Sequence, residues 1–481
     1  MRITRIEDKQ RKISVMLKNF LSDKAYFSAL VQISLPIIIQ QFIMSSLNMV
    51  DVVMIGQLGE TAIAAVGLSN QIFFLLGLLL FGISSGAAIF SAQYWGKKDI
   101  TNIHKVLGVC VTSGVLAGVL FSIIALVFPE TTLGIYTKDS EVIALGGEYL
   151  RIVGFCYVAI TITFSYSAIL RSTENVKLPM TVSIIALSLN TFINYLLIFG
   201  NLGFPEMGVR GAAIATLISR TFECTTLLLL TYIKKTPAAA KIQDLLGFVN
   251  RPFLKRYFKT TLPVVLNELT WSLGITTYSI VYARISTEAL AAVNIAMTIE
   301  NMAHVVFSGL GHASAIMIGK KIGTNEMDRA HQYAGRSITL AITGAVIMGG
   351  VIIASAGKLL TLYNISEISR GFAHGELIVG GFVLWIRASN MTIMIGVLRS
   401  GGDTRFAFVV ELLTIWVVGV PLAFLGAFVF HLPVYWVYLL VATEELMKFI
   451  IGFMRFRSKK WINNLVQNIS SPAVVEAVLG D

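Results

Sequence analysis

Twelve long apolar runs divide the chain, and no other feature limits its fold as strongly. A helix that crosses a bilayer needs about 20 apolar residues, whereas a membrane strand needs about ten residues of alternating polarity. None of the runs alternates, so we expect an all-α integral membrane protein with twelve transmembrane helices in a lipid bilayer. The runs lie at 29–55, 62–90, 104–128, 142–170, 179–200, 208–233, 261–284, 289–317, 335–357, 372–398, 407–430 and 433–457.

The composition excludes an ordinary soluble enzyme. Hydrophobic residues make up 55% of the 481 positions and charged residues 14%, against about 25% charged residues in soluble proteins. The three cysteines lie within apolar runs and show neither a CxxC motif nor a zinc-ligand spacing. We therefore expect no disulfide, no structural metal and no cofactor.

The positive charges follow a topological pattern. Of the 38 Lys and Arg residues, 30 lie in seven clusters between alternate apolar runs. Cytoplasmic loops carry such an excess of basic residues, so both termini are predicted to be cytoplasmic in a multi-pass protein of the plasma (inner) membrane. The formal net charge of +11 is then explained without nucleic acid as a partner. The clusters are 2–24, 97–105, 171–177, 234–259, 320–336, 399–405 and 448–460.

An internal repeat relates the two halves of the chain. An offset of 227 residues aligns Pro36 with Pro263 and Gly96 with Gly323, and an offset of 228 aligns the Leu-Arg-Ser triplet at 170–172 with that at 398–400. Six spans separate equivalent points, so both halves cross the membrane in the same sense and are expected to form two six-helix bundles related by a pseudo-two-fold axis along the membrane normal. The predicted parts are a cytoplasmic segment 1–28, an N-terminal lobe 29–233, a cytoplasmic linker 234–260 with an amphipathic helix, a C-terminal lobe 261–457 and a cytoplasmic tail 458–481.

Three carboxylates within the apolar runs are candidates for cation or proton coupling: Asp51, Glu268 and Glu300. An ionisable group at the bilayer centre costs about 2.5–3.5 kcal/mol on insertion scales and therefore needs a compensating reason. The alternative for each is a structural ion pair, and Arg387 could serve Glu268 or Glu300 in this way. The N-terminal half offers Asp51 no equally central basic partner.

Other polar and aromatic residues in the runs are expected to support substrate or coupling-ion binding, or alternatively to pack between helices. Pro36 and Pro263, near the starts of the first and seventh spans, are candidate hinges. Two pairs are expected to neutralise themselves on one helix face, Arg220 with Glu223 and Glu444 with Lys448, and Glu411 is given no role. The candidate supporting residues are Asn190, Asn194, Gln41, Asn48, Trp271, Tyr278 and Asn301.

Three segments resemble the prokaryotic multidrug and toxic compound extrusion family: VDVVMIGQLG at 50–59, the stretch from KLPM to GVRGAAIAT at 177–216, and GVLRSGGDTR at 396–405. The resemblance implies an antiporter that exports organic cations and amphipathic compounds by alternating access, in exchange for H⁺ or Na⁺. It also implies that Asp51 matches the acid of the first span, and that Asn190 and Asn194 match a polar pair of the fifth.

The C-terminal half departs from the family pattern. The family acid of the seventh span falls near Trp271, one turn beyond Glu268, and that of the tenth span aligns with Ala388. A Na⁺ site near Asp51 or Glu268 therefore stays an alternative to proton coupling, and we expect a monomer. A flippase for a lipid-linked or polyprenyl precursor is the second interpretation. An intramembrane enzyme is the third, although HExxH and DDxxD motifs are absent.

Overall fold

The computed structural model describes residues 23–247 and 250–467, and these contain helices and turns but no strand. The long helices are α2 (Lys24–Gly56), α3 (Glu60–Gly96), α4 (Ile100–Val127), α6 (Ser140–Val153), α7 (Tyr157–Ser172), α8 (Lys177–Phe199), α9 (Gly208–Ile233), α11 (Arg251–Ile285), α12 (Thr287–Gly323), α13 (Met327–Leu360), α14 (Glu367–Met391), α15 (Thr404–Leu413) and α17 (Val434–Arg457). The short elements are α5 (Pro129–Leu133), η1 (Gly154–Cys156), η2 (Asn201–Gly203), α10 (Ile242–Leu246), η3 (Thr392–Arg399), η4 (Thr414–Gly419), α16 (Val420–Phe424) and η5 (Leu425–Val429).

Continuous helical segments occupy the positions of the twelve predicted spans, which confirms the predicted all-α membrane fold within the described ranges. Three of them join several elements: 140–172, 367–399 and 404–429. Ten segments are long and apolar enough to cross a membrane. The other two, α11 and α17, carry more polar side chains, including Glu268 on α11 and Glu444 on α17.

Several helices extend beyond the apolar runs that predicted them. The run at 261–284 lies within α11, which already begins at Arg251 and has a proline in its first turn. The run at 289–317 lies within α12, which continues to Gly323. Hydropathy detects the lipid-matched part of a helix, whereas backbone hydrogen bonding continues into the polar flanks. The segment 234–260 consequently contains the five-residue α10 and the first turns of α11.

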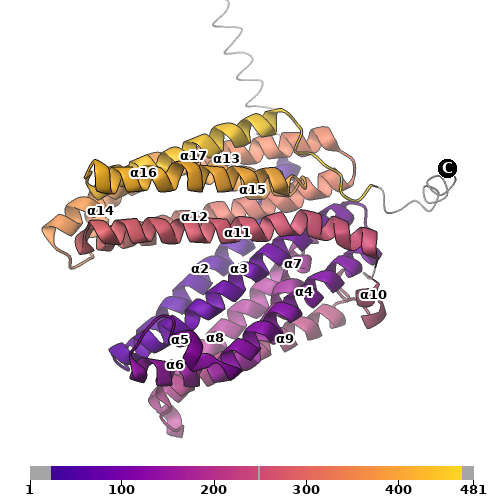
Figure 1. Ribbon diagram of the computed structural model, residues 1–481. Coiled ribbons are helices and arrows are strands. Elements are labelled where there is room, and N and C mark those ends of the chain that lie inside the picture. The colour runs from indigo at the N-terminus through magenta and orange to yellow at the C-terminus, as the bar shows by residue number, and fades with distance from the viewer. Residues whose placement is uncertain (1–22, 248–249, 468–481) are drawn as a thin grey trace, which may run out of the picture.

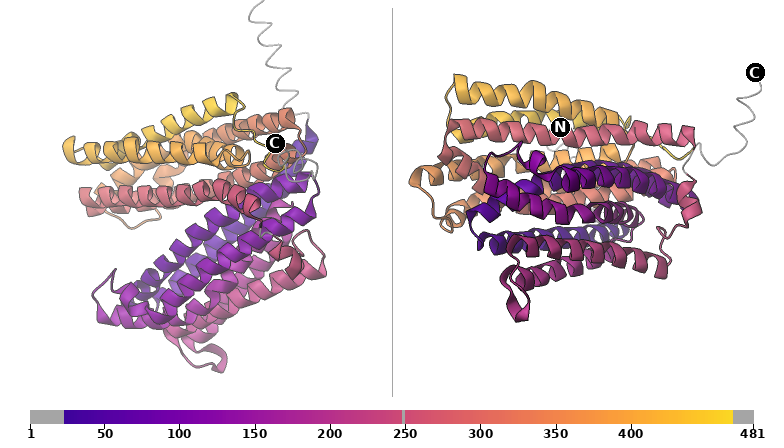
Figure 2. Two further views of the ribbon diagram at one scale, coloured as in Figure 1. Left: turned by 45° about the vertical axis from the view of Figure 1, so that its right-hand side comes forward. Right: turned by 60° about the horizontal axis from the view of Figure 1, so that its bottom comes forward.

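The helices form two bundles, an N-terminal lobe of α2 to α9 and a C-terminal lobe of α11 to α17 (Figure 1). The lobes converge at the end that carries α10, which we call the closed end, and diverge toward the opposite end (Figures 1 and 2). The junctions between α2 and α3 and between α13 and α14 lie at the divergent end.

Glycines allow the two lobes to approach closely. A methyl group added at Gly96 would overlap the backbone oxygen of Lys320, and one added at Gly323 would overlap the backbone oxygen of Gln93. Gln93 and Lys320 are themselves equivalent in the repeat of 227 residues. Each lobe therefore contributes the same two positions of the repeat to the crossing, as a pseudo-two-fold axis requires.

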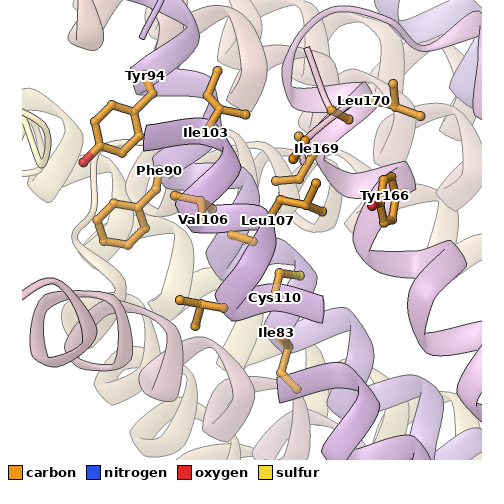
Figure 3. Packing of buried hydrophobic residues seen from close by; sticks show 14 of the residues in the cluster. Ile83, Phe90, Tyr94, Ile103, Val106, Leu107, Cys110, Tyr166, Ile169 and Leu170 are labelled. Atoms are coloured by element: carbon orange, nitrogen blue, oxygen red, sulfur yellow. The ribbon is translucent and has the colours of Figure 1, made fainter. Parts of the chain in front are cut away.

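Within each lobe, buried apolar side chains hold the helices in register. Figure 3 shows one such cluster, in which Phe90 of α3 and Leu107 of α4 are fully buried beside Ile169 and Leu170 of α7. The last two residues directly precede Arg171, so this packing fixes where the end of α7 presents its arginine.

Candidate transport site

Asp51 lies near the end of α2, toward the end where the lobes diverge, and faces α8. The side-chain amide of Asn194 donates to Oδ1 of Asp51 at 3.0 Å and to Oδ1 of Asn190 at 3.4 Å. Both asparagines are buried, and Asp51 is half-buried. The structure thus brings together the three residues that the sequence predicted in the N-terminal lobe.

Two buried polar atoms beside Asp51 have no hydrogen-bond partner. Nδ2 of Asn190 and Oδ1 of Asn194 are buried without a hydrogen-bond partner. Within residues 23–247 and 250–467, Asp51 forms no ion pair with an arginine or a lysine. Buried polar atoms without partners are rare in proteins and are costly unless a ligand or water satisfies them. A carboxylate with amide neighbours and no ion-pair partner is suited to exchange one bound cation for another.

Arg220 forms its ion pair with a carboxylate on its own helix. Its guanidinium lies 2.9 Å from Glu223 on α9, which confirms the predicted same-helix pair. The hydroxyl of Ser183 on α8 also donates to Glu223 at 2.6 Å. The positive charge of Arg220 is therefore satisfied locally.

Glu268 in the C-terminal lobe has an arginine partner. Arg399 lies 2.6 Å from Oε1 of Glu268 and also donates to Oδ1 of the preceding residue, Asn267. Arg399 was grouped with the cytoplasmic charge cluster in the sequence, but its side chain is 6% exposed. A cation at Glu268 would have to replace this guanidinium.

Glu300 is also paired. Arg387 lies 2.7 Å from its Oε2, and the hydroxyl of Tyr438 donates to the same oxygen at 2.7 Å. Of the two partners that the sequence left open for Arg387, the structure selects Glu300. Within the described ranges no cluster of three or more His, Cys, Asp or Glu side chains could hold a metal ion. The two C-terminal acids also occupy separate ion pairs.

A second polar network corrects one sequence interpretation. Lys448 lies 3.0 Å from Glu411 and 3.5 Å from Glu445, so the predicted pairing of Glu444 with Lys448 is wrong. Glu444 instead accepts a hydrogen bond from Tyr278 at 2.8 Å. Lys448 turns toward α15, where the carboxylate of Glu411 is also buried. Glu411, to which the sequence gave no role, is a counter-ion.

The remaining predicted residues are dispersed. Gln41 donates to Ser308 of the other lobe at 3.3 Å. Trp271 is 41% exposed, Asn48 and Asn301 are exposed, and Tyr278 is buried. Pro36 and Pro263 lie inside α2 and α11, at equivalent positions of the repeat.

Sequence reasoning missed a cavity between the lobes. It is lined by α3 and α7 from one lobe and by α12 and η3 from the other, and its polar side chains include Arg171, Arg399 and His312. The available signal was the repeated Leu-Arg-Ser triplet, which was used only as evidence for duplication. Reasoning from the sequence also missed Glu376 on α14, whose two carboxylate oxygens are buried without a partner.

Ion pairs between the lobes seal the closed end beyond this cavity. Lys320 of α12 lies 2.7 Å from Glu174, which follows α7. Asp23 caps the start of α2 and pairs with Arg336 of α13, and this guanidinium lowers the pKa of Asp23 from its ordinary value. Contacts of this kind close one side of a transporter while the other side stays open.

A family model described as MatE matches residues 36–196 and again residues 263–425. The two matches begin 227 residues apart, at the two prolines of the repeat. The chain belongs to this family of multidrug transporters, the multidrug and toxic compound extrusion family. As a MatE protein it is an integral membrane transporter, which agrees with the fold and the repeat described above.

Curated relatives of this MatE protein match it over nearly the whole length. The probable multidrug resistance protein YoeA of Bacillus subtilis is 27% identical over 445 residues, 90% of this chain and 94% of its own. The probable multidrug resistance protein NorM of Thermotoga maritima is 24% identical over 437 residues, 90% of this chain and 92% of its own.

Solved structures show the same fold at lower sequence identity. A crystal structure of MATE in the bent conformation has a TM-score of 0.82 at 21% identity, covering 90% of this chain and 96% of that one. A transporter of the MOP superfamily from Pyrococcus furiosus has a TM-score of 0.81 at 21% identity, covering 90% and 95%. These matches confirm the two-bundle fold, and the family model confirms the predicted family.

Proposed function

We propose that the protein is a cation-coupled multidrug antiporter of the plasma (inner) membrane that works as a monomer with both termini in the cytoplasm. It exports organic cations and amphipathic compounds in exchange for H⁺ or Na⁺. The observation that carries this proposal is the half-buried Asp51, hydrogen-bonded by Asn194 and free of any ion pair within the described residues. The names of the relatives, which are multidrug resistance proteins, support the substrate class.

Competition at Asp51 provides the coupling. Burial disfavours a charged carboxylate, so Asp51 gains from binding a proton, a Na⁺ ion or the cationic group of a drug. The carboxylate of Asp51 binds only one of these cations at a time. The coupling ion that arrives from outside therefore displaces the drug. Each elementary charge moved down the membrane potential supplies about 2.3 kcal/mol per 100 mV.

Alternating access follows from the arrangement of the lobes. The divergent end corresponds to the outward side in the predicted topology, and the ion pairs at the closed end seal the cytoplasmic side. Pro36 and Pro263 are the proposed bending points, because a proline removes one backbone hydrogen bond from each helix. Glu268 and Glu300 act after Asp51 in this scheme, since each must first leave an arginine.

Transport by purified protein in proteoliposomes tests the proposal. Efflux of an ethidium-like dye is measured under an imposed pH gradient and, separately, an imposed Na⁺ gradient, for wild type, Asp51→Asn and Glu268→Gln. We expect Asp51→Asn to abolish coupled efflux under the gradient that drives wild type. Glu148→Gln is the matched control, because Glu148 forms an exposed ion pair with Arg210 on the same lobe. Full efflux by Asp51→Asn would refute the role of Asp51.

A further inference from the structure

Arg171 is a cation without a counter-ion inside the cavity between the lobes. It lies at the end of α7 and contributes to the cavity lining. Its guanidinium forms no hydrogen bond and no ion pair with any residue of 23–247 or 250–467. Burying a charge is expensive unless it is paired, so an unpaired guanidinium at a cavity indicates a missing partner.

The repeat shows which partner is missing. Arg171 and Arg399 are equivalent, and Arg399 is neutralised by Glu268 at 2.6 Å. The position equivalent to Glu268 in the N-terminal lobe is Gln41, which carries no charge and donates instead to Ser308. One half of the molecule therefore keeps its arginine neutralised, and the other half leaves it positive.

The cavity around Arg171 is suited to part of an amphipathic molecule. Most of its lining is apolar, with Phe81 and Ile316 among the contributing side chains. His312 adds an imidazole whose Nδ1 donates to the backbone oxygen of Ser308 at 2.8 Å, so Nε2 of the neutral ring is a hydrogen-bond acceptor. The cavity volume of about 90 Å³ admits a compact group rather than a whole drug. Gln93 closes the adjacent end by donating to the backbone oxygen of Ser400 at 3.0 Å.

We propose that Arg171, with Arg399 beside it, forms an anion subsite that binds the carboxylate or phosphate group of an amphipathic transport substrate. The apolar lining of the cavity holds the part of the substrate next to this anionic group. Guanidinium binds such oxyanions through two parallel hydrogen bonds, which neither a lysine nor an amide can reproduce. This inference rests on the proposed transport function.

A matched pair of ligands tests the subsite: a cationic xanthene dye as its methyl ester, and the same dye with the free carboxylate. Binding to purified full-length protein is measured by fluorescence anisotropy, and efflux is measured in proteoliposomes. Arg171→Gln is expected to weaken binding of the free acid by about tenfold, as loss of a charge-assisted contact does. Binding of the ester is expected to stay within about twofold of wild type.

Gln41→Glu gives a second test that keeps Arg171 in place. It introduces a glutamate, the residue type found at the equivalent position of the other lobe. We therefore expect Arg171 to be neutralised, and the free acid to bind as weakly as it binds to Arg171→Gln. Arg151→Gln is the matched control, because Arg151 forms an exposed pair with Glu130 in the same lobe.

The outcomes separate the subsite from the transport function. Equal weakening of acid and ester by Arg171→Gln, or no change in either, would overturn the subsite. Loss of co-purified anionic phospholipid from Arg171→Gln with unchanged dye binding would also overturn it, in favour of a lipid. If wild type fails to transport the ester under any gradient, the proposed function fails, while the binding measurements still decide the subsite.

Discussion

Nζ of Lys320 lies 2.7 Å from Oε1 of Glu174, and this ion pair joins the C-terminal lobe to the N-terminal lobe at the closed end. The two side chains are 38% and 30% exposed, so water weakens their attraction without removing it. Glu174 also accepts a hydrogen bond from the indole of Trp95 at 3.0 Å, which orients the carboxylate toward α12. The pair exists only while the lobes are together at this end, so it acts as a latch on one conformation.

Breaking the latch is expected to shift the conformational equilibrium. A partly exposed ion pair contributes about 0.2–1 kcal/mol, so losing it should favour the state open at this end by up to about fivefold, and Lys320→Glu, which adds repulsion from Glu174, should have a larger effect. Spin labels at Leu202 and Leu362, which are both 79% exposed, would report the change in distance between the lobes. The reversed pair Lys320→Glu with Glu174→Lys should restore the wild-type distribution.

A control for the latch is an ion pair inside one lobe. Lys459 and Asp328 lie 3.0 Å apart and both belong to the C-terminal part of the chain. Lys459→Gln should leave the distance distribution unchanged. A shift of similar size in this variant would show that general surface charge, and not the latch, sets the equilibrium.

Asn194→Ala removes the amide that donates to Asp51. Hydrogen bonds to a charged group contribute about 1.5–3 kcal/mol, so we expect the affinity for a cationic dye to change by about tenfold or more. In an Asp51→Asn background the same substitution should have little further effect, because its partner is already lost. Asn201→Ala is the control, since it also removes a 3.0 Å amide hydrogen bond, but to the backbone of Tyr195. Independent effects of the two substitutions would contradict the contact.

Gly323→Ala tests the close crossing of the lobes. Its added methyl group would overlap the backbone of Gln93, which cannot move as a side chain can. Overpacking of this kind costs about 1–3 kcal/mol, so the closed end should open or the protein should melt at a lower temperature. Gly350→Ala on α13 meets nothing within 4 Å and should not destabilise the protein. An unchanged label distance and melting temperature in Gly323→Ala would show that the lobes do not meet as described.

The sequence predicted the spans because apolar run length is a local property. The run at 208–233 coincides with α9, and that at 433–457 differs from α17 by one residue. The repeat was also visible, because equivalent residues such as Gly96 and Gly323 keep a constant offset. Helix ends such as Arg251 were missed, since the polar flank of a helix has no hydropathy signal.

Pairing between helices was the part that the sequence could not determine. Glu444 and Lys448 have the spacing of a helical ion pair, yet Lys448 contacts Glu411, 37 positions away. Arg399 looked like a cytoplasmic charge because it begins a basic cluster, and only the three-dimensional structure shows that its guanidinium binds Glu268 of α11. Asp51 could be proposed from the sequence because it has no basic residue to pair with on its own helix.

The pH dependence of the closed end follows from Asp23. Its hydrogen bond with Arg336 lowers its pKa in the folded protein, so the pair stabilises the protein above the unfolded value of about 4. This stability is lost as the pH falls through the lowered pKa. Between pH values of about 5 and 8 the difference in melting temperature between wild type and Asp23→Asn should be constant, and it should shrink only below about pH 4. A difference that vanishes near neutral pH would assign the titration to another group.

Variants of the buried pair of Glu300 and Arg387 test whether this pair has a structural role or a coupling role. Removing one member leaves a buried charge, so Arg387→Met should destabilise the protein by about 3–5 kcal/mol. The double variant Glu300→Gln with Arg387→Met should recover much of this loss, because no uncompensated charge remains, and Tyr438 keeps a hydrogen-bond acceptor. Arg370→Met is the control, since its pair with Glu367 is exposed. Melting temperature and dye efflux are measured for each variant. A double variant as stable as wild type that still fails to transport would show that the pair of Glu300 and Arg387 serves coupling and not only stability.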